Sequence, residues 1–236
     1  MARIILIETA TDLCSTALSE DGKVVCSRES DVPRAHASMT AVFVDQMLRE
    51  RGLRVSDCDA VCVSMGPGSY TGLRVGSSTA KGLCFGAGIP LLAVTTAEVL
   101  VAGALAEGLV PEGCSAIVPM IDARRMEVYS AVFSPDGKQR TDIAPTVVTS
   151  ETFSGLVRGG KVLFIGDGAG KCRGIICEAA GESAPEPVFI GTEPRAAWMA
   201  GPAERAFAAG EWRDTAYFEP LYIKDFVATV SRKKLF

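Results

Sequence analysis

The glycine-rich segment 63–76, VSMGPGSYTGLRVG, is the stretch whose residue types most resemble a binding site. It follows a predicted buried strand, DAVCVSM, and precedes a predicted helix, which is where α/β proteins often bind phosphate. Counting from Gly66, Thr71 stands where a Walker loop has its second glycine and where the dinucleotide fingerprint has its third. Ser69 lies between Pro67 and Thr71, so it lacks the flanking glycines of a nucleophile elbow. The segment therefore matches none of these three patterns.

Metal-dependent and histidine-assisted hydrolysis need residues that this sequence largely lacks. Its single histidine, His36, stands near the start of a predicted helix over 36–51, and Thr40 occupies the position four residues later. An H-x-x-x-H pair of metal ligands on one helix face is therefore excluded. We interpret His36 as a polar residue at a helix N-terminus, and a metallopeptidase is disfavoured.

The eight cysteines do not form a recognisable metal or disulfide pattern, because no two of them are spaced C-x-x-C. Cys58 and Cys62 lie in one predicted strand, about 13 Å apart, which is too far for a disulfide. We interpret the cysteines as small buried hydrophobes.

Composition describes an ordinary globular chain of 236 residues, 48% hydrophobic and 22% charged, with a net charge of −4. This acidic balance disfavours a chain that alone grips a nucleic-acid backbone. The first apolar run ends at Glu8, too early for a signal peptide, and no run approaches the roughly 20 residues of a membrane span. We expect a cytoplasmic protein with no membrane partner.

The two halves of the chain repeat one order of elements. Each half is predicted to contain three antiparallel strands, a helix, a strand and another helix, with hairpin turns at Asp21-Gly22 and Asp136-Gly137. SMGPGSYTG in the first half matches FIGDGAGKC in the second. This repeat predicts an α/β fold of the actin-like (ASKHA, ribonuclease-H-like) class, with two similar lobes of mixed sheet flanked by helices. We place the lobes at 1–105 and 106–236, the last helix or tail being free to pack back.

Two acids occupy the positions that hold Mg²⁺ in actin-like ATPases, at the end of the first strand of each lobe. They are Glu8, in LIETA, and Asp122, in MIDAR. Glu8 is one methylene longer than the usual aspartate, and no adenosine-binding G-G segment is recognisable. Two interpretations remain open: a stand-alone actin-like ATPase or kinase, or a vestigial cleft with at most a weak nucleotide contact. The residues concerned are Glu8, Gly66, Gly68, Ser69, Thr71 and Asp122.

Four segments resemble the TsaB (YeaZ) family, and together they span nearly the whole chain: IETATDLCSTAL, GPGSYTGLRVG, IDARRMEVYSAVF and EPLYIKDF. The family is the dimerisation subunit of the bacterial machinery that adds threonylcarbamoyl to the adenosine next to the anticodon of tRNAs reading ANN codons. The resemblance implies an actin-like scaffold without catalysis and without a required cofactor, and gives no support to the older glycoprotease label. Glu8 departs from the family's common DTAT, which weakens a nucleotide role further.

The resemblance also implies the partners. TsaD carries the chemistry, TsaC makes the threonylcarbamoyl-adenylate, TsaE is a P-loop ATPase that completes the assembly, and tRNA is reached indirectly through the complex. Pairing with TsaD is implied to use the two helices of the N-terminal lobe in a four-helix bundle. An excess apolar face there also predicts a homodimer when the chain is alone.

The predicted interface combines an apolar arc on the first helix with a row of small residues on the second. The residues are Met39, Phe43, Met47, Leu73, Gly76, Ala80 and Leu83. The row of small residues can equally pack on its own sheet, and this alternative stays open. We expect Ser69 or Thr71 to cap the second helix. The basic end, SRKKLF, is interpreted as a solvated tail that could contact tRNA or an acidic partner.

Overall fold

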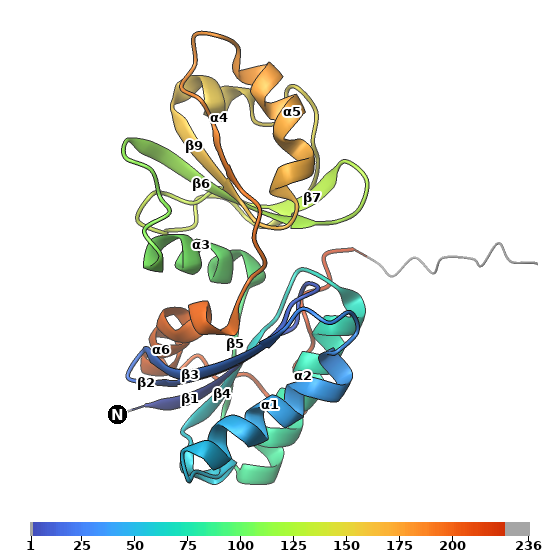
Figure 1. Ribbon diagram of the computed structural model, residues 1–236, viewed down its shortest axis with the longest axis vertical. Coiled ribbons are helices and arrows are strands. Elements are labelled where there is room, and N and C mark those ends of the chain that lie inside the picture. The colour runs from blue at the N-terminus through green and yellow to red at the C-terminus, as the bar shows by residue number, and fades with distance from the viewer. Residues whose placement is uncertain (1, 225–236) are drawn as a thin grey trace, which may run out of the picture.

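The computed structural model describes residues 2–224, which form two five-stranded mixed sheets flanked by helices (Figure 1). The predicted tail SRKKLF lies outside the described residues. No helix within 2–224 combines the length and apolarity needed to cross a bilayer.

The first sheet has the strand order β3-β2-β1-β4-β5. Its elements are β1 (Arg3–Glu8), β2 (Cys14–Glu20), β3 (Lys23–Ser30), α1 (His36–Glu50), the 3-10 turn η1 (Val55–Asp57), β4 (Ala60–Ser64), α2 (Tyr70–Ala87), β5 (Leu91–Val94) and α3 (Thr96–Ala106). The hairpin strands pair antiparallel, whereas β1, β4 and β5 pair in parallel. Helix α3 begins with a capping box, in which Thr95 and Glu98 satisfy each other's backbone N–H groups.

The second sheet has the order β10-β9-β6-β7-β8, which is the same topology. Its elements are β6 (Cys114–Asp122), β7 (Glu127–Ser130), β8 (Ala144–Val147), α4 (Ser154–Gly159), β9 (Lys161–Ile165), α5 (Ala169–Ala180) and β10 (Val188–Ile190), followed by η2 (Ala196–Met199) and α6 (Ala200–Ala208). The predicted repeat of three antiparallel strands, helix, strand and helix is confirmed.

The run RMEVYSAVFS, residues 125–134, predicts one strand before the Asp136-Gly137 turn, and this prediction is wrong in its second part because regular pairing ends at Ser130. Beyond it the chain bends, and Phe133 exchanges two backbone hydrogen bonds with Ile117, of 2.8 and 2.9 Å. This bend buries the Phe133 ring in the core shared by the two lobes.

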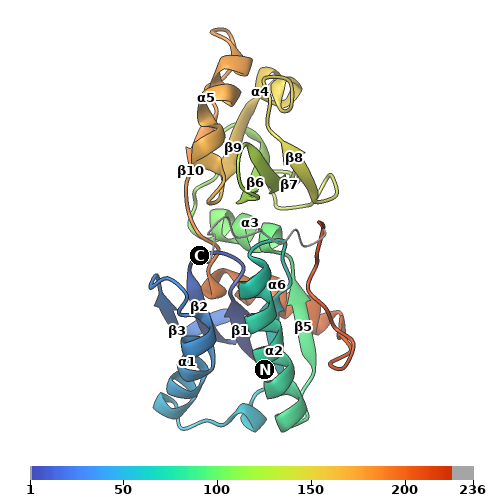
Figure 2. The same ribbon diagram turned by 90° about the vertical axis from the view of Figure 1, so that its right-hand side faces the viewer.

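The chain crosses back to the first lobe after β10. The η2 turn packs on β1 and β2, and α6 packs on β1, β3 and β5. Helices α1 and α2 lie side by side on the opposite face of that sheet, and α3 lies between the lobes (Figures 1 and 2). Residues that follow the second lobe in sequence therefore complete the first lobe in space.

Candidate functional site

The glycine-rich turn between β4 and α2 is closely packed on one side by residues that follow β1. The Ser69 N–H donates to the Ala10 carbonyl oxygen at 2.7 Å, and a Cβ on Gly68 would lie 2.2 Å from that oxygen. The Ser69 Oγ accepts from the Gly72 N–H at 3.3 Å, which confirms Ser69 as the cap of α2, and Thr71 lies exposed in the first turn. Glycine is required at Gly68 by close backbone approach.

The other side of this turn is covered by residues 213–224, which we call the strap. Its Leu221 N–H donates to the Met65 carbonyl oxygen at 2.7 Å, and the Leu221 carbonyl lies 3.3 Å from where a Gly66 Cβ would be. The Tyr222 ring lies 5.0 Å from that of Tyr70 at the start of α2. The sequence has no hydrophobic periodicity in this segment that would predict its contact with the glycine-rich turn. EPLYIKDF was singled out only because it resembles the TsaB family.

Further contacts hold the strap to both lobes. The Lys81 Nζ donates to the carbonyl oxygens of Ala216 and Phe218, at 2.9 and 3.1 Å. At the other end, Lys224 forms an ion pair with Glu127 of the second lobe. The glycine-rich turn is therefore enclosed by the chain's own backbone on two sides.

Glu8 is fully buried at the end of β1. Its Oε1 accepts from the Ala10 N–H at 2.7 Å, while Oε2 has no hydrogen-bond partner among the described residues. Burial raises the pKa of Glu8 to about 7, because desolvation penalises the carboxylate. A carboxyl group with a pKa near 7 is only partly ionised at neutral pH, whereas a Mg²⁺ site needs ionised oxygen ligands. Glu8 is therefore poorly suited to bind Mg²⁺.

The second-lobe acid lies in a different environment. Asp122 is exposed, and its Oδ1 pairs with the Lys171 Nζ at 2.7 Å. Next to it, Asp167 accepts a 2.9 Å hydrogen bond from the Asp122 N–H, and burial raises the pKa of Asp167 to about 6. Glu193, in the segment that returns to the first lobe, raises the pKa of both Glu8 and Asp167 through charge repulsion.

Asp167 and Glu193 were not among the predicted site residues. Asp167 could have been found from GDGAGKC, the second glycine turn, whereas no local signal marks Glu193. Within 2–224, no group of three or more His, Cys, Asp or Glu residues is arranged to hold a metal ion.

His36 and the buried cysteines make contacts that stabilise the fold. The His36 Nε2 lies 2.9 Å from the Thr11 carbonyl oxygen, which ties the start of α1 to the segment after β1. All eight cysteines are free, and burial raises the thiol pKa of buried members such as Cys62 and Cys84. A raised pKa opposes the thiolate form that a nucleophile requires.

The residues predicted for a partner interface lie mostly inside the first lobe. Phe43, Met47, Leu73, Gly76 and Ala80 are buried, and Met39 and Leu83 are half-buried. The first group fills the space between the two helices and the sheet, so it cannot contact a partner directly.

Two members of the row of small residues on α2, Gly72 and Gly76, pack on Thr9, the residue that follows the first strand. A Cβ on Gly76 would lie 2.2 Å from the Thr9 Oγ1, and one on Gly72 would lie 2.1 Å from the Thr9 carbonyl oxygen. The Thr9 hydroxyl donates to the Gly72 carbonyl at 2.9 Å, which holds the two segments together. Of the two readings of this row, packing on its own sheet is the one the structure shows.

The outer face of α1 and α2 is formed by other residues. Phe85 is 88% exposed, and Val42 and Tyr70 are also exposed apolar side chains on these helices. Gly82, one turn before Phe85, has open space where a Cβ would be. Sequence reasoning missed Phe85 because it selected the row of small residues on another side of α2.

Comparisons with known proteins agree with this architecture. A family model described as TsaD, tRNA N6-adenosine threonylcarbamoyltransferase, matches residues 29–190. The chain is 31% identical over 238 residues to the tRNA threonylcarbamoyladenosine biosynthesis protein TsaB of Escherichia coli (strain K12), covering 96% of each chain. The chain belongs to the TsaB family.

Solved structures support the TsaB fold. YeaZ from Pseudomonas aeruginosa superposes with a TM-score of 0.76 and 27% identity, over 94% of this chain and 100% of that one. The ROK hexokinase from Thermus thermophilus is similar in fold alone, with a TM-score of 0.50 and 11% identity over 86% of this chain and 98% of that one. The predicted actin-like class is confirmed.

Proposed function

We propose that the chain is a non-catalytic scaffold in threonylcarbamoyladenosine biosynthesis, and that it binds a TsaD-like protein through the outer face of α1 and α2. The observation that carries the docking proposal is Phe85, a large apolar side chain in the last turn of α2 that is left 88% exposed. Exposed aromatic anchors of this kind are typical centres of protein interfaces.

The match to a TsaD family model over 29–190 supports the choice of partner. This range includes both α1 and α2, so a TsaD-like protein is expected to present equivalent helices. Pairing equivalent helix pairs gives a self-complementary, pseudo-twofold four-helix bundle. In this proposal TsaE and tRNA are reached through the complex, and the same face forms a homodimer when the chain is alone.

The non-catalytic part of the proposal rests on the strand-end groups. Glu8 is buried and its pKa is raised, and the glycine-rich turn is enclosed by Ala10 and the strap. Both features oppose the Mg²⁺–phosphate geometry of an actin-like ATPase.

A matched pair of substitutions tests docking. Gly82→Arg places a charged side chain in open space beside Phe85, and Gly174→Arg makes the same change at an open, exposed position of α5. Both variants should fold. We expect Gly82→Arg to weaken binding of the TsaD-like partner at least about 100-fold in calorimetry, and Gly174→Arg to leave it unchanged.

If Gly82→Arg and Gly174→Arg bound the TsaD-like partner with equal affinity, the outer face of α1 and α2 would not be the interface. A reconstituted modification assay with this chain omitted then tests the scaffold role, which tRNA modification at an undiminished rate would overturn. Light scattering of the isolated chain should show a dimer that Gly82→Arg converts to a monomer.

A further inference from the structure

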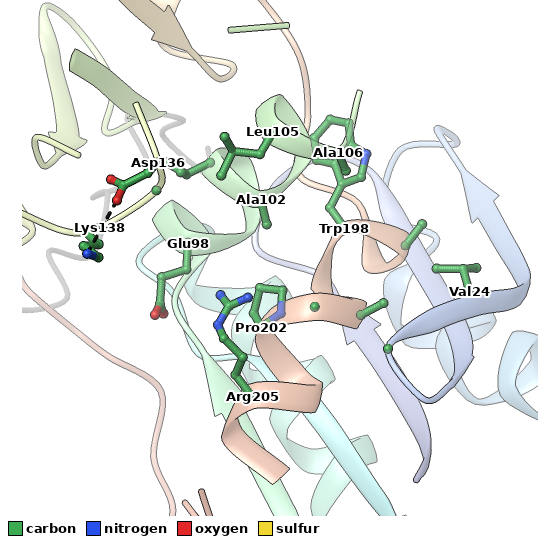
Figure 3. Close-up of a pocket in the computed structure, with 16 residues that line it drawn as sticks. Val24, Glu98, Ala102, Leu105, Ala106, Asp136, Lys138, Trp198, Pro202 and Arg205 are labelled. Atoms are coloured by element: carbon green, nitrogen blue, oxygen red, sulfur yellow. Dashed lines mark ion pairs between the residues drawn. The ribbon is translucent and has the colours of Figure 1, made fainter. Parts of the chain in front are cut away.

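A groove of about 730 Å³ lies between α3 and the η2–α6 segment (Figure 3). It reaches Gly22 and Val24 at the β2–β3 turn, beside the start of β1, whereas Glu8 stands at the other end of that strand. The groove is therefore separate from the strand-end acids and from the outer face of α1 and α2. Its volume is in the usual range for small-ligand sites, roughly 300–1,000 Å³.

Trp198 lines the groove, and three neighbouring residues hold its ring in place. The indole Nε1 donates to the Glu107 Oε1 at 2.7 Å, and the ring lies where a Cβ on Gly103 would be, 2.2 Å from the nearest ring atom. The Arg195 guanidinium lies 5.8 Å from the ring centroid. A ring fixed by three neighbours cannot fall into the groove and fill it.

The walls come from both lobes and are mainly apolar. Helix α3 contributes Val101, Ala102 and Leu105 to the lining, and α6 contributes Pro202. Figure 3 shows Ala102 on the side of α3 that faces Pro202. The hairpin over 134–138 closes the remaining side, and at Gly137 a Cβ would lie 2.7 Å from the Leu105 Cδ1. A molecule in the groove would contact both lobes.

Of the four charged groups that line the groove, Glu98 and Arg205 have no ion pair within 2–224. The Glu98 Oε2 already accepts from the N–H and hydroxyl of Thr95, at 2.8 and 2.7 Å. Asp136 and Lys138 form an ion pair at 3.6 Å. Arg205 is exposed and has no ion pair within 2–224, and its guanidinium lies beside Pro202 in the groove.

From this geometry we propose that the groove binds a small amphipathic carboxylate, with its apolar body between α3 and α6 and its carboxylate on Arg205. A single planar guanidinium suits a carboxylate, to which it can donate two parallel hydrogen bonds. The apolar walls and the fixed indole bury the body of the ligand at little cost in reorganisation. Because both lobes line the groove, the bound ligand also stabilises their relative placement.

The test uses Trp198 as an internal reporter. Trp212→Phe leaves Trp198 as the only tryptophan, and Phe85→Ser in the same chain removes the exposed docking anchor as a competing dye site. The probe is 1-anilinonaphthalene-8-sulfonate, an apolar ring system with one anionic group. We expect saturable energy transfer from Trp198 to the bound dye. Octanoate should displace the dye and abolish this signal, whereas octylamine should not.

Three variants on that background decide the assignment. Arg205→Gln should weaken octanoate binding about tenfold, whereas Arg51→Gln, at an exposed arginine outside the groove, should leave it unchanged. Ala102→Phe should fill the groove and abolish the signal, with unfolding temperatures confirming that each variant is folded. The proposal is overturned by a folded background chain without saturable transfer, by equal displacement with octylamine, or by equal octanoate affinity in the two arginine variants.

Discussion

Helices α1 and α2 of the first lobe run for 15 and 18 residues, whereas their second-lobe counterparts α4 and α5 run for 6 and 12. Within 2–224, Val42, Tyr70 and Phe85 are large apolar side chains exposed on the longer pair, and none is exposed on α4 or α5. A helix that only covers a sheet needs one apolar face. The extra length and outer apolar face of the first lobe therefore point to a role beyond its own stability.

The acids at the ends of the first strand of each lobe also differ, in their burial. Glu8 is fully buried, whereas Asp122 is exposed and paired with Lys171. In the first lobe, Gly68, Gly72 and Gly76 bring α2 against Thr9 and Ala10. Glu8 and Asp122 occupy equivalent positions in the two lobes. The closer packing of the first lobe buries Glu8 and so raises its pKa.

The largest stability change expected at a fixed pH tests this closer packing. Gly76→Ala should lower the free energy of unfolding by about 2–3 kcal/mol, because its Cβ would overlap the Thr9 Oγ1, which is itself held by Gly72. Gly174→Ala in α5 has open space and should instead stabilise by about 0.5–1 kcal/mol through helix propensity. Urea denaturation measures both, and effects of the same sign would contradict the difference in packing.

The buried acid should make stability depend on pH. The pKa of Glu8 is about 7 in the folded chain and about 4.5 when unfolded, so the folded state holds the proton more tightly and stability falls as pH rises between these values. The full loss is about 3 kcal/mol, of which about 1 kcal/mol falls between pH 6 and 8. Glu8→Gln should remove this slope in unfolding measurements, and an unchanged slope from pH 6 to 8 would show that another group causes it.

The smallest effect is expected at the equivalent site of the second lobe. Lys171→Met removes the ion pair with Asp122 and a 2.7 Å hydrogen bond to the Glu127 carbonyl oxygen. Because both charged side chains are partly exposed, it should cost about 0.5–1 kcal/mol. The cost should shrink further in 1 M salt, because exposed charges are screened. A cost as large as that of Gly76→Ala would mean that the two strand ends are equally critical to the fold.

Local sequence was sufficient for most elements. Apolar runs and DG turns located the hairpins, Ser69 was one of two residues predicted to cap α2, and the repeated order of elements identified the actin-like class. These features depend on neighbours within a few residues, so they can be read without knowing the tertiary structure.

Only the tertiary structure decided which faces are free and which groups are charged. Gly72 and Gly76 of α2 face inward, where Thr9 comes within about 2 Å of the positions that their Cβ atoms would take. Burial raises the pKa of Glu8 to about 7, and the strap reaches Lys81 from residues more than a hundred positions away. Periodicity specifies that a helix has an apolar side, but long-range packing determines how much of that side is left for a partner.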